Sequence, residues 1–161
     1  MKLKSLTLVL LGLTLTATSF CQVKIIAPDK IWPAEKAGEW YKKQPYLVGA
    51  NYIPANAINQ LEMWQADTFA PAVIDKELGW AEGLGMNTMR VFLHSLAYKA
   101  DPAGFKSRMN EFLKIADKHH IRPMFVFFDD CWNKVPQIGR QPEKKTGIHN
   151  SGWMQDPGDP A

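Results

Sequence analysis

The chain has 161 residues, 46% of them hydrophobic and 22% charged, and 19 Lys and Arg residues stand against 16 Asp and Glu. Such a chain is long enough to bury one ordinary hydrophobic core. Lys2 and Lys4 lie in a segment that we expect to be removed, and without them 17 basic residues face 16 acidic ones. This near-balance of charge argues against a protein that binds nucleic acid or a membrane surface.

Residues 1–21 have the layout of a secretory signal peptide. Residues 1–4 are basic, and residues 6–20 are uncharged and rich in Leu and Thr. This run is shorter than the ~20 apolar residues of a membrane-spanning helix, so we expect export to the periplasm or the extracellular space and no transmembrane segment in the mature chain. Cleavage after Cys21 leaves small residues, Ser19 and Cys21, at both recognition positions. A lipoprotein anchored through Cys21 is the alternative, which the bulky Phe20 disfavours.

Strand and helix patterns alternate in the mature chain. An amphipathic stretch over residues 33–43 comes first, and we expect it to pack on the base or the side of the fold. Short apolar runs then predict strands over residues 46–51, 88–93 and 123–128. Two segments with helical periodicity separate them, one from Pro71 to Leu84 and one that begins at Asp101-Pro102. This order is typical of an α/β fold with a parallel sheet.

The two predicted helices carry recognisable start and stop signals. The first has Pro71 in its opening turn and Gly85 as its stop, and the second has Asp101 as its N-cap. Their apolar stripes are Ile74, Leu78, Ala81 and Leu84 in the first, and Phe105, Met109, Phe112, Leu113 and Ala116 in the second. His119 and His120 end the second helix, where cations favour the helix dipole, so a structural role explains both better than a metal site.

Residues 129–161 are polar, rich in Pro, Gly and Asn, and without a period. A structureless segment of about thirty residues is unusual in a compact domain. Two interpretations remain open at this point. The segment is either a functional loop after the third strand or a tail left by truncation.

Strand alternation selects candidate site residues. In the second strand, Met89 and Val91 share the apolar face that should pack on helices, so Arg90 points to the opposite face. A buried guanidinium needs an anionic or strongly hydrogen-bonding partner, so Arg90 either holds a catalytic carboxylate or closes an ordinary ion pair. His94, just beyond the strand, and Asn51, at the end of the first strand, are candidates to bind a ligand hydroxyl or a carboxylate. A satisfied loop histidine is the alternative for His94.

The third strand ends in Asp129-Asp130-Cys131-Trp132. Paired carboxylates are typical of enzymes that cleave glycosidic bonds, which place one carboxylate on each side of the bond. Asp129 and Asp130 would not do so, because neighbouring side chains in extended backbone point to opposite faces. Asp129 shares a face with Phe125 and Phe127 and is the preferred contact to substrate. Trp132 is a candidate platform for a sugar ring, as are, more weakly, Trp64 and Trp153, although each could equally pack in the core or a loop. No zinc spacing is present, and we expect neither a metal nor a cofactor.

The second predicted strand covers most of the segment Asn87-Thr88-Met89-Arg90-Val91-Phe92, which is preceded by Leu84-Gly85. A helix and an Ile-Arg-Pro-Met-Phe-Val-Phe-Phe-Asp strand follow it. This order of segments resembles the N-terminal part of clan A glycoside hydrolases. Cellulases, mannanases and xylanase-like enzymes with a (β/α)₈ TIM barrel belong to this clan. Residues 59–65 and 149–153 are similar to a group of exported bacterial proteins described as xylanase-like or cellulase-like. The resemblance covers roughly residues 32–158.

The resemblance implies that residues 22–161 form about three βα units at the N-terminus of a TIM barrel. It implies a retaining O-glycosyl hydrolase for a plant-type β-glycan of the cellulose, mannan or xylan class, in which Arg90 contacts the nucleophile. The family places its acid/base Glu at the end of the fourth strand and its nucleophile Glu at the end of the seventh. None of the seven Glu residues here ends a predicted strand. We therefore expect a truncated chain that is inactive alone; the alternative is a small, non-catalytic exported module that binds carbohydrate or acts as a scaffold.

Overall fold

The computed structural model describes residues 31–159, so the predicted signal peptide and the alternatives for Cys21 lie outside the described residues. The chain divides into two compact units, residues 1–44 and 45–161. In the first unit, α1 (Ala34–Lys42) follows Pro33 and occupies the amphipathic stretch of residues 33–43. Its packing against the rest of the chain stays a prediction. No helix within residues 31–159 is long and apolar enough to cross a membrane.

The second unit contains a three-stranded parallel sheet in the order β1 (Gly49–Tyr52), β2 (Thr88–Phe92) and β3 (Arg122–Val126). The predicted α/β arrangement with parallel strands is confirmed. The first strand begins later than predicted because residues 46–48 bond to a side chain. Asn87 accepts from the backbone N–H of Val48 at 2.8 Å and donates to the carbonyl of Tyr46 at 2.8 Å.

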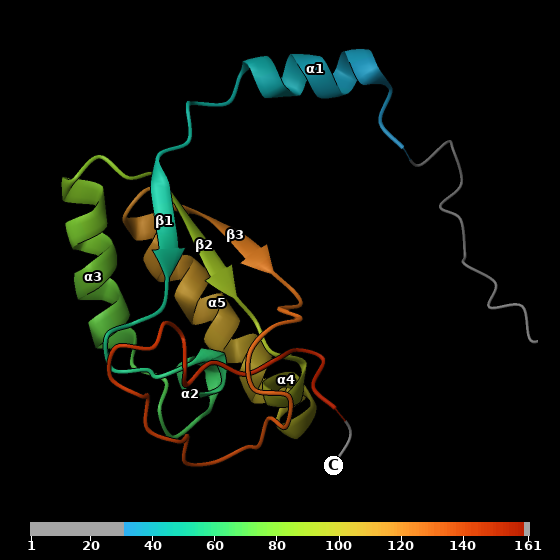
Figure 1. The fold of residues 1–161 in the computed structure, drawn as a ribbon. Helices are drawn as coiled ribbons and strands as arrows, with labels where there is room; N and C mark the ends of the chain where they lie inside the picture. The colour runs from blue at the N-terminus through green and yellow to red at the C-terminus, as the bar shows by residue number, and fades with distance from the viewer. Residues whose placement is uncertain (1–30, 160–161) are drawn as a thin grey trace, which may run out of the picture. The chain divides into compact units, whose positions relative to one another are not determined.

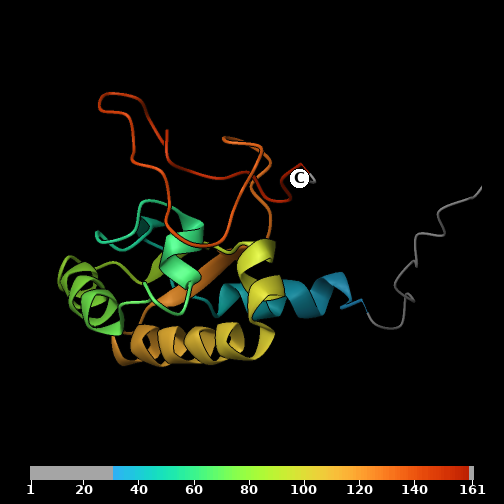
Figure 2. The ribbon, with the colours of Figure 1, turned by 90° about the horizontal axis from the view of Figure 1, so that it is seen from below.

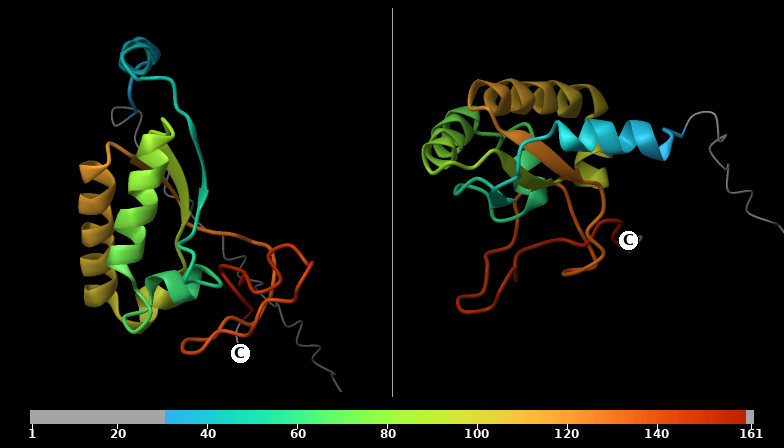
Figure 3. Two further views of the ribbon diagram at one scale, coloured as in Figure 1. Left: turned by 90° about the vertical axis from the view of Figure 1, so that its left-hand side faces the viewer. Right: turned by 90° about the horizontal axis from the view of Figure 1, so that it is seen from above.

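Two long helices, α3 (Pro71–Gly83) and α5 (Pro102–Lys118), lie side by side on one face of the sheet (Figures 1 and 3). Met89 and Val91 point between the sheet and these helices and are buried, as alternation predicts. Within the described part of the second unit, no helix covers the opposite face (Figure 3). One face of the sheet therefore builds the core, and the other carries Arg90.

The helix boundaries differ from prediction at the end of α3. The helix stops at Gly83, and Leu84 is 76% exposed rather than part of the buried stripe. Gly85 ends the turn with a φ of 80°, a conformation that favours glycine. At the start of α5, Asp101 accepts from the N–H of Gly104 at 2.9 Å and confirms the predicted cap. Leu113 is 39% exposed, so the stripe of α5 is narrower than predicted.

Two short helices, α2 (Gln60–Trp64) and α4 (Ser95–Ala100), were not predicted from the periodicity. The side chain of Asn59 accepts from the N–H of Glu62 at 3.0 Å, while Glu62 accepts from the N–H of Ile58 at 2.6 Å. This exchange is close to a capping box, a pattern that the spacing of Asn59 and Glu62 displays. His94 caps α4, accepting from the N–H of Leu96 at 3.2 Å. Histidine is not a preferred cap, which explains why α4 carries no clear sequence signal.

Residues 129–159 form a long loop that folds back across the carboxyl ends of the strands (Figures 1 and 2). Isolated bridges pair Asp129 with Asp156 and Asn133 with Met154. The loop also bonds to α2, because the side chain of Asn59, its N-cap, donates to the side chain of Gln141 and to the carbonyl of Gly152, both at 2.8 Å. A loose tail is therefore the wrong alternative for this segment, and the loop is part of the packed unit.

Candidate functional site

A cleft of about 390 Å³ opens at the carboxyl ends of the strands. The ends of β1 and β2, the segment after β3 and the far part of the loop all contribute to it. Parallel strands bring their carboxyl ends to one edge of the sheet, where ligand sites of α/β proteins are commonly built. The residues that line the cleft are Asn51, Ile53, Arg90, Phe92, Asp129, Trp132, His149, Asn150 and Trp153. Five residues predicted from the sequence, namely Asn51, Arg90, Asp129, Trp132 and Trp153, thus meet in one place.

Arg90 lies on the open face of the sheet with its guanidinium over the ring of Phe92, 4.4 Å from the ring centroid. One terminal nitrogen donates to Oδ1 of Asn51 at 3.3 Å, a pair made possible because Asn51 and Arg90 are register partners in β1 and β2. Among residues 31–159, no carboxylate forms an ion pair with Arg90. The guanidinium is therefore oriented by an amide and a ring, with donors left for a further partner.

Asp129 and Trp132 form a hydrogen-bonded pair in the segment after β3. The indole N–H of Trp132 donates to Oδ2 of Asp129 at 3.1 Å, and Gln60 donates to the same oxygen at 3.4 Å. Trp132 adopts a φ of 77°, which is unfavourable for a bulky residue. The hydrogen bond and the unusual backbone together hold the indole at the cleft.

The wall of the cleft that faces the strand ends is formed by His149, Asn150 and Trp153 of the long loop. The ring of His149 meets Trp132 edge-on with centroids 5.7 Å apart, and Trp153 meets Phe92 edge-on at 5.0 Å. Asn150 has a φ of 49°, so two of the three non-glycine residues with positive φ in the described chain line this cleft. Strained backbone of this kind concentrates at functional sites.

Two predicted site residues lie elsewhere. Trp64 is fully buried at 0% exposure, and its indole N–H donates to the carbonyl of Phe92 at 2.8 Å, so it cannot serve as a sugar platform in this structure. It packs on Phe69, Phe105 and Phe112 in the core. His94 is 1% exposed and donates from Nε2 to the carbonyl of Gln155 at 3.2 Å, which corrects its expected contact with substrate. Burial lowers the pKa of His94, although the nearby Asp156 acts in the opposite direction.

Sequence reasoning missed the contribution of four residues to the cleft, namely Ile53, Phe92, His149 and Asn150. Phe92 shares the face of Arg90 by strand alternation, so the signal for it was present. His149 and Asn150 reach the cleft only through the path of the loop, for which no periodic pattern exists. Within residues 31–159, no group of three or more His, Cys, Asp or Glu side chains is placed to hold a metal ion.

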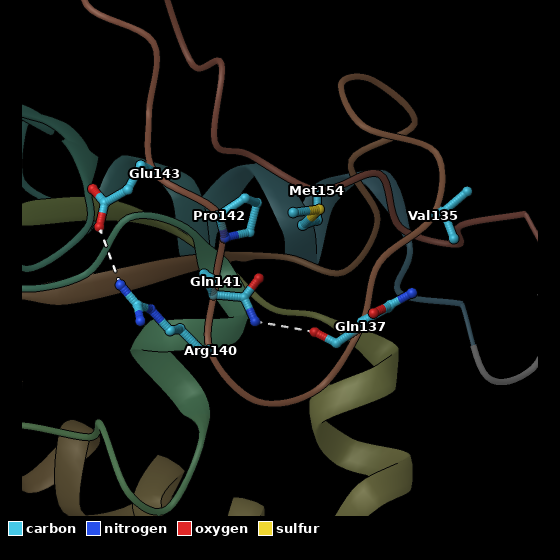
Figure 4. Close-up of a pocket in the computed structure, with 7 residues that line it drawn as sticks. All are labelled: Val135, Gln137, Arg140, Gln141, Pro142, Glu143 and Met154. Atoms are coloured by element: carbon cyan, nitrogen blue, oxygen red, sulfur yellow. Dashed lines mark hydrogen bonds and ion pairs between the residues drawn. The ribbon is translucent and has the colours of Figure 1, made fainter.

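A second hollow of about 450 Å³ lies within the loop and is lined by Val135, Gln137, Arg140, Gln141, Pro142, Glu143 and Met154 (Figure 4). Gln141 donates to the carbonyl of Gln137 at 3.0 Å and so braces the loop. Arg140 and Glu143 approach to 3.9 Å, but both are almost fully exposed, and such surface pairs contribute little. None of the residues predicted from the sequence lines this hollow, so we place the candidate site in the cleft.

No family model and no curated protein matches the chain. Among solved structures, part of the chain is similar to the exo-beta-1,4-mannosidase Op5Man5 from Opitutaceae bacterium strain TAV5, with 32% sequence identity and a TM-score of 0.43. The match covers 49% of this chain and 14% of the mannosidase chain. The similarity is thus confined to about half of this chain and to a small part of that enzyme.

Proposed function

We propose that the cleft binds a carbohydrate chain, and that residues 22–161 form the first three strand-helix units of a (β/α)₈ glycoside hydrolase. The observation that carries this proposal is the convergence of Asn51, Arg90, Asp129, Trp132 and Trp153 at the carboxyl ends of three parallel strands. The proposed reaction class is retaining hydrolysis of a plant-type β-glycan of the cellulose, mannan or xylan class. Export through the signal peptide at residues 1–21 belongs to the same proposal.

The chemistry of the cleft suits a sugar. Indole faces stack on the axial C–H groups of a pyranose ring, and Trp132 and Trp153 supply two indoles. Sugar hydroxyls need donors and acceptors in fixed positions, which Asn51, Asp129 and His149 offer around the same space. Aromatic walls with a few convergent polar groups are the usual composition of such sites.

The uncovered face of the sheet supports the barrel. Met124 on β3 is 52% exposed, and Arg90 and Asn51 are exposed on the same sheet. Within the described residues, β1 and β3 each pair only with β2, which leaves two open edges. Further strands would cover those edges and turn the open face into the lumen, since only a closed sheet has no edges.

Arg90 has a definite task in this proposal. An Arg without an ion pair in its own unit is suited to hold a carboxylate that comes from another part of the barrel. The seven Glu residues of this chain all lie within the described residues, and none lines the cleft. The nucleophile would therefore come from strands beyond the three described, and residues 22–161 alone should not hydrolyse aryl β-glycosides.

A titration tests the binding function. Residues 22–161 would be titrated with cellohexaose, mannohexaose and xylohexaose, and the affinities measured by calorimetry. We expect Trp132→Ala to weaken the best ligand about tenfold or more, because an aromatic platform is lost. Trp80→Ala, which removes a 60% exposed indole from α3, is the matched control and should change nothing. Equal affinity in both variants, or no binding by the wild type, would refute a carbohydrate site in the cleft.

The second candidate is a complete, non-catalytic carbohydrate-binding or scaffold module. It is favoured by the absence of any buried, unbonded side-chain polar atom among residues 31–159. A complete module should unfold cooperatively and bind little hydrophobic dye. A barrel portion should bind the dye through the exposed Phe127 and Phe128 and tend to aggregate. A thermal melt with dye fluorescence separates the two candidates.

A further inference from the structure

Asp156 joins the end of the long loop to the start of α4. Its side chain is 0% exposed, and its carboxylate accepts from Ser95 twice, from the backbone N–H at 2.9 Å and from the hydroxyl at 2.5 Å. The backbone N–H of Asp156 donates to the carbonyl of Asp129 at 2.8 Å. A single buried residue thus links three segments: the loop end, the β2–α4 junction and the segment after β3.

His94 strengthens the same junction. Its Nδ1 accepts from the N–H of Leu96, so the ring proton lies on Nε2, which donates to the carbonyl of Gln155 at 3.2 Å. Nδ1 lies 3.7 Å from Oδ1 of Asp156. Residues 155 and 156 are therefore held by two consecutive residues, His94 and Ser95, at the end of β2.

The junction is connected to the walls of the cleft through backbone pairing. Gln155 donates to the carbonyl of Asn133 at 2.9 Å, and Asn133 donates to the carbonyl of Trp153 at 3.2 Å. Asn133 directly follows Trp132, and Trp153 lies three residues before Asp156. The backbone of both cleft indoles therefore belongs to the paired segments that Asp156 anchors.

We propose that Asp156, held by Ser95, is a positioning residue that fixes Trp132 and Trp153 in the cleft. The choice of a glycan as ligand rests on the proposed function, but the positioning of the two indoles does not. The core of the unit offers an independent reference. Trp64 lies in that core with its own bond to the carbonyl of Phe92, whereas the carboxylate of Asp156 bonds to Ser95. A positioning role predicts that the cleft indoles respond to loss of Asp156 while Trp64 does not.

The test follows the indole N–H signals of the ¹⁵N-labelled mature chain by NMR, assigned with single Trp→Phe variants. In Asp156→Ala, the Trp132 and Trp153 signals should shift or broaden, and the Trp64 signal should stay in place. Asp156→Asn keeps an acceptor for Ser95 and should restore the signals in part, while Ser95→Ala should reproduce a weaker form of the change. Asp159→Ala is the control, because Asp159 lies in the same loop end, is exposed, and bonds through its backbone to Lys134.

The same variants are titrated with whichever of cellohexaose, mannohexaose and xylohexaose the wild type binds best. We expect about a tenfold loss of affinity in Asp156→Ala and none in Asp159→Ala, since a mobile platform must be ordered on binding. Unchanged Trp132 and Trp153 signals would overturn the inference. The inference would also be overturned if the Trp64 signal shifted together with the Trp132 and Trp153 signals in Asp156→Ala, Asp156→Asn and Ser95→Ala. Asp156 would then support the whole fold rather than the cleft. If the wild type binds no hexaose, the proposed function fails, and the indole signals alone decide the role of Asp156.

Discussion

The indole N–H of Trp132 donates to the carboxylate of Asp129, and Nε1 of Trp132 lies 3.1 Å from Oδ2 of Asp129. The bond joins two residues three positions apart in the segment after β3 and holds a tryptophan that is 39% exposed. A carboxylate that orients an indole leaves the ring face free for a ligand. Asp129 therefore acts on the cleft through Trp132 as well as through its own oxygens.

Asp129→Ala should weaken binding more than Asp129→Asn, measured with whichever of cellohexaose, mannohexaose and xylohexaose the wild type binds best. Asparagine can still accept from the indole, whereas alanine leaves the Trp132 ring without its partner. A bond to a charged group contributes ~1.5–3 kcal/mol, so we expect roughly a tenfold or larger loss for Asp129→Ala. Calorimetric titration of both variants measures the difference. Equal affinities for the wild type and Asp129→Ala would show that the ring is held by the loop backbone alone.

Gly49→Ala should destabilise the fold. A Cβ at this position would lie 1.9 Å from the carbonyl oxygen of Thr88, its register partner on β2. Relieving such a clash needs a backbone shift, and overpacking of this kind costs ~1–3 kcal/mol. Urea unfolding of the variant measures the loss. Gly83→Ala at the end of α3 is the control: its Cβ would meet nothing within 4 Å, and alanine favours the helix.

The positions of Asn51 and Arg90 could be predicted because strand alternation and a parallel sheet place strand ends together. Asp129 lies in the cleft for another reason: β3 ends at Val126, and Phe125, whose face Asp129 was expected to share, packs on the core. Trp64 could not be assigned in the same way. Its sequence surroundings are compatible with either a platform or a core residue, and only the packing on Phe105 and Phe112 decides between them. Aromatic side chains serve both roles, so residue type alone does not separate them.

The loop was the part least accessible from sequence. Its path depends on single residues in unusual conformations, Trp132 and Asn150 with positive φ, and on side chains such as Asn59 that bond across more than eighty positions. Neither feature produces a repeat in the sequence. No sequence pattern therefore predicts that His149 lines the cleft. The helix α2 is different, because the capping pattern of Asn59 and Glu62 could have indicated it.

The fold should lose stability as the pH falls below about 6.5, in part through His94. Burial lowers the pKa of His94 from its ordinary value of 6.5, so the unfolded chain binds more protons in that range. The free energy of unfolding then rises with pH until the unfolded histidine is neutral, and falls as pH drops from 6.5 toward the lowered pKa. Urea unfolding at pH 7.5, 6.5 and 5.5 would measure this slope.

His94→Asn isolates the contribution of this one histidine. Asparagine can still cap α4 but does not titrate, so the slope between pH 7.5 and 5.5 should become flatter. His149→Asn removes an exposed histidine of the cleft and serves as the comparison. The lowered pKa values of Asp75 and Glu82, held by bonds to Lys118 and His120 respectively, act at more acidic pH and should not obscure the difference. An unchanged slope in His94→Asn would contradict the assignment.

Trp64→Phe should separate the core from the cleft. Phenylalanine keeps an aromatic ring among Phe69, Phe105 and Phe112 but loses the N–H that donates to the carbonyl of Phe92. The lost bond and the smaller ring together should lower the free energy of unfolding by ~1–3 kcal/mol. Hexaose affinity should remain that of the wild type, because the ring is fully buried and does not line the cleft. Trp132→Ala should instead weaken hexaose binding, so one pair of unfolding and titration experiments tests both assignments.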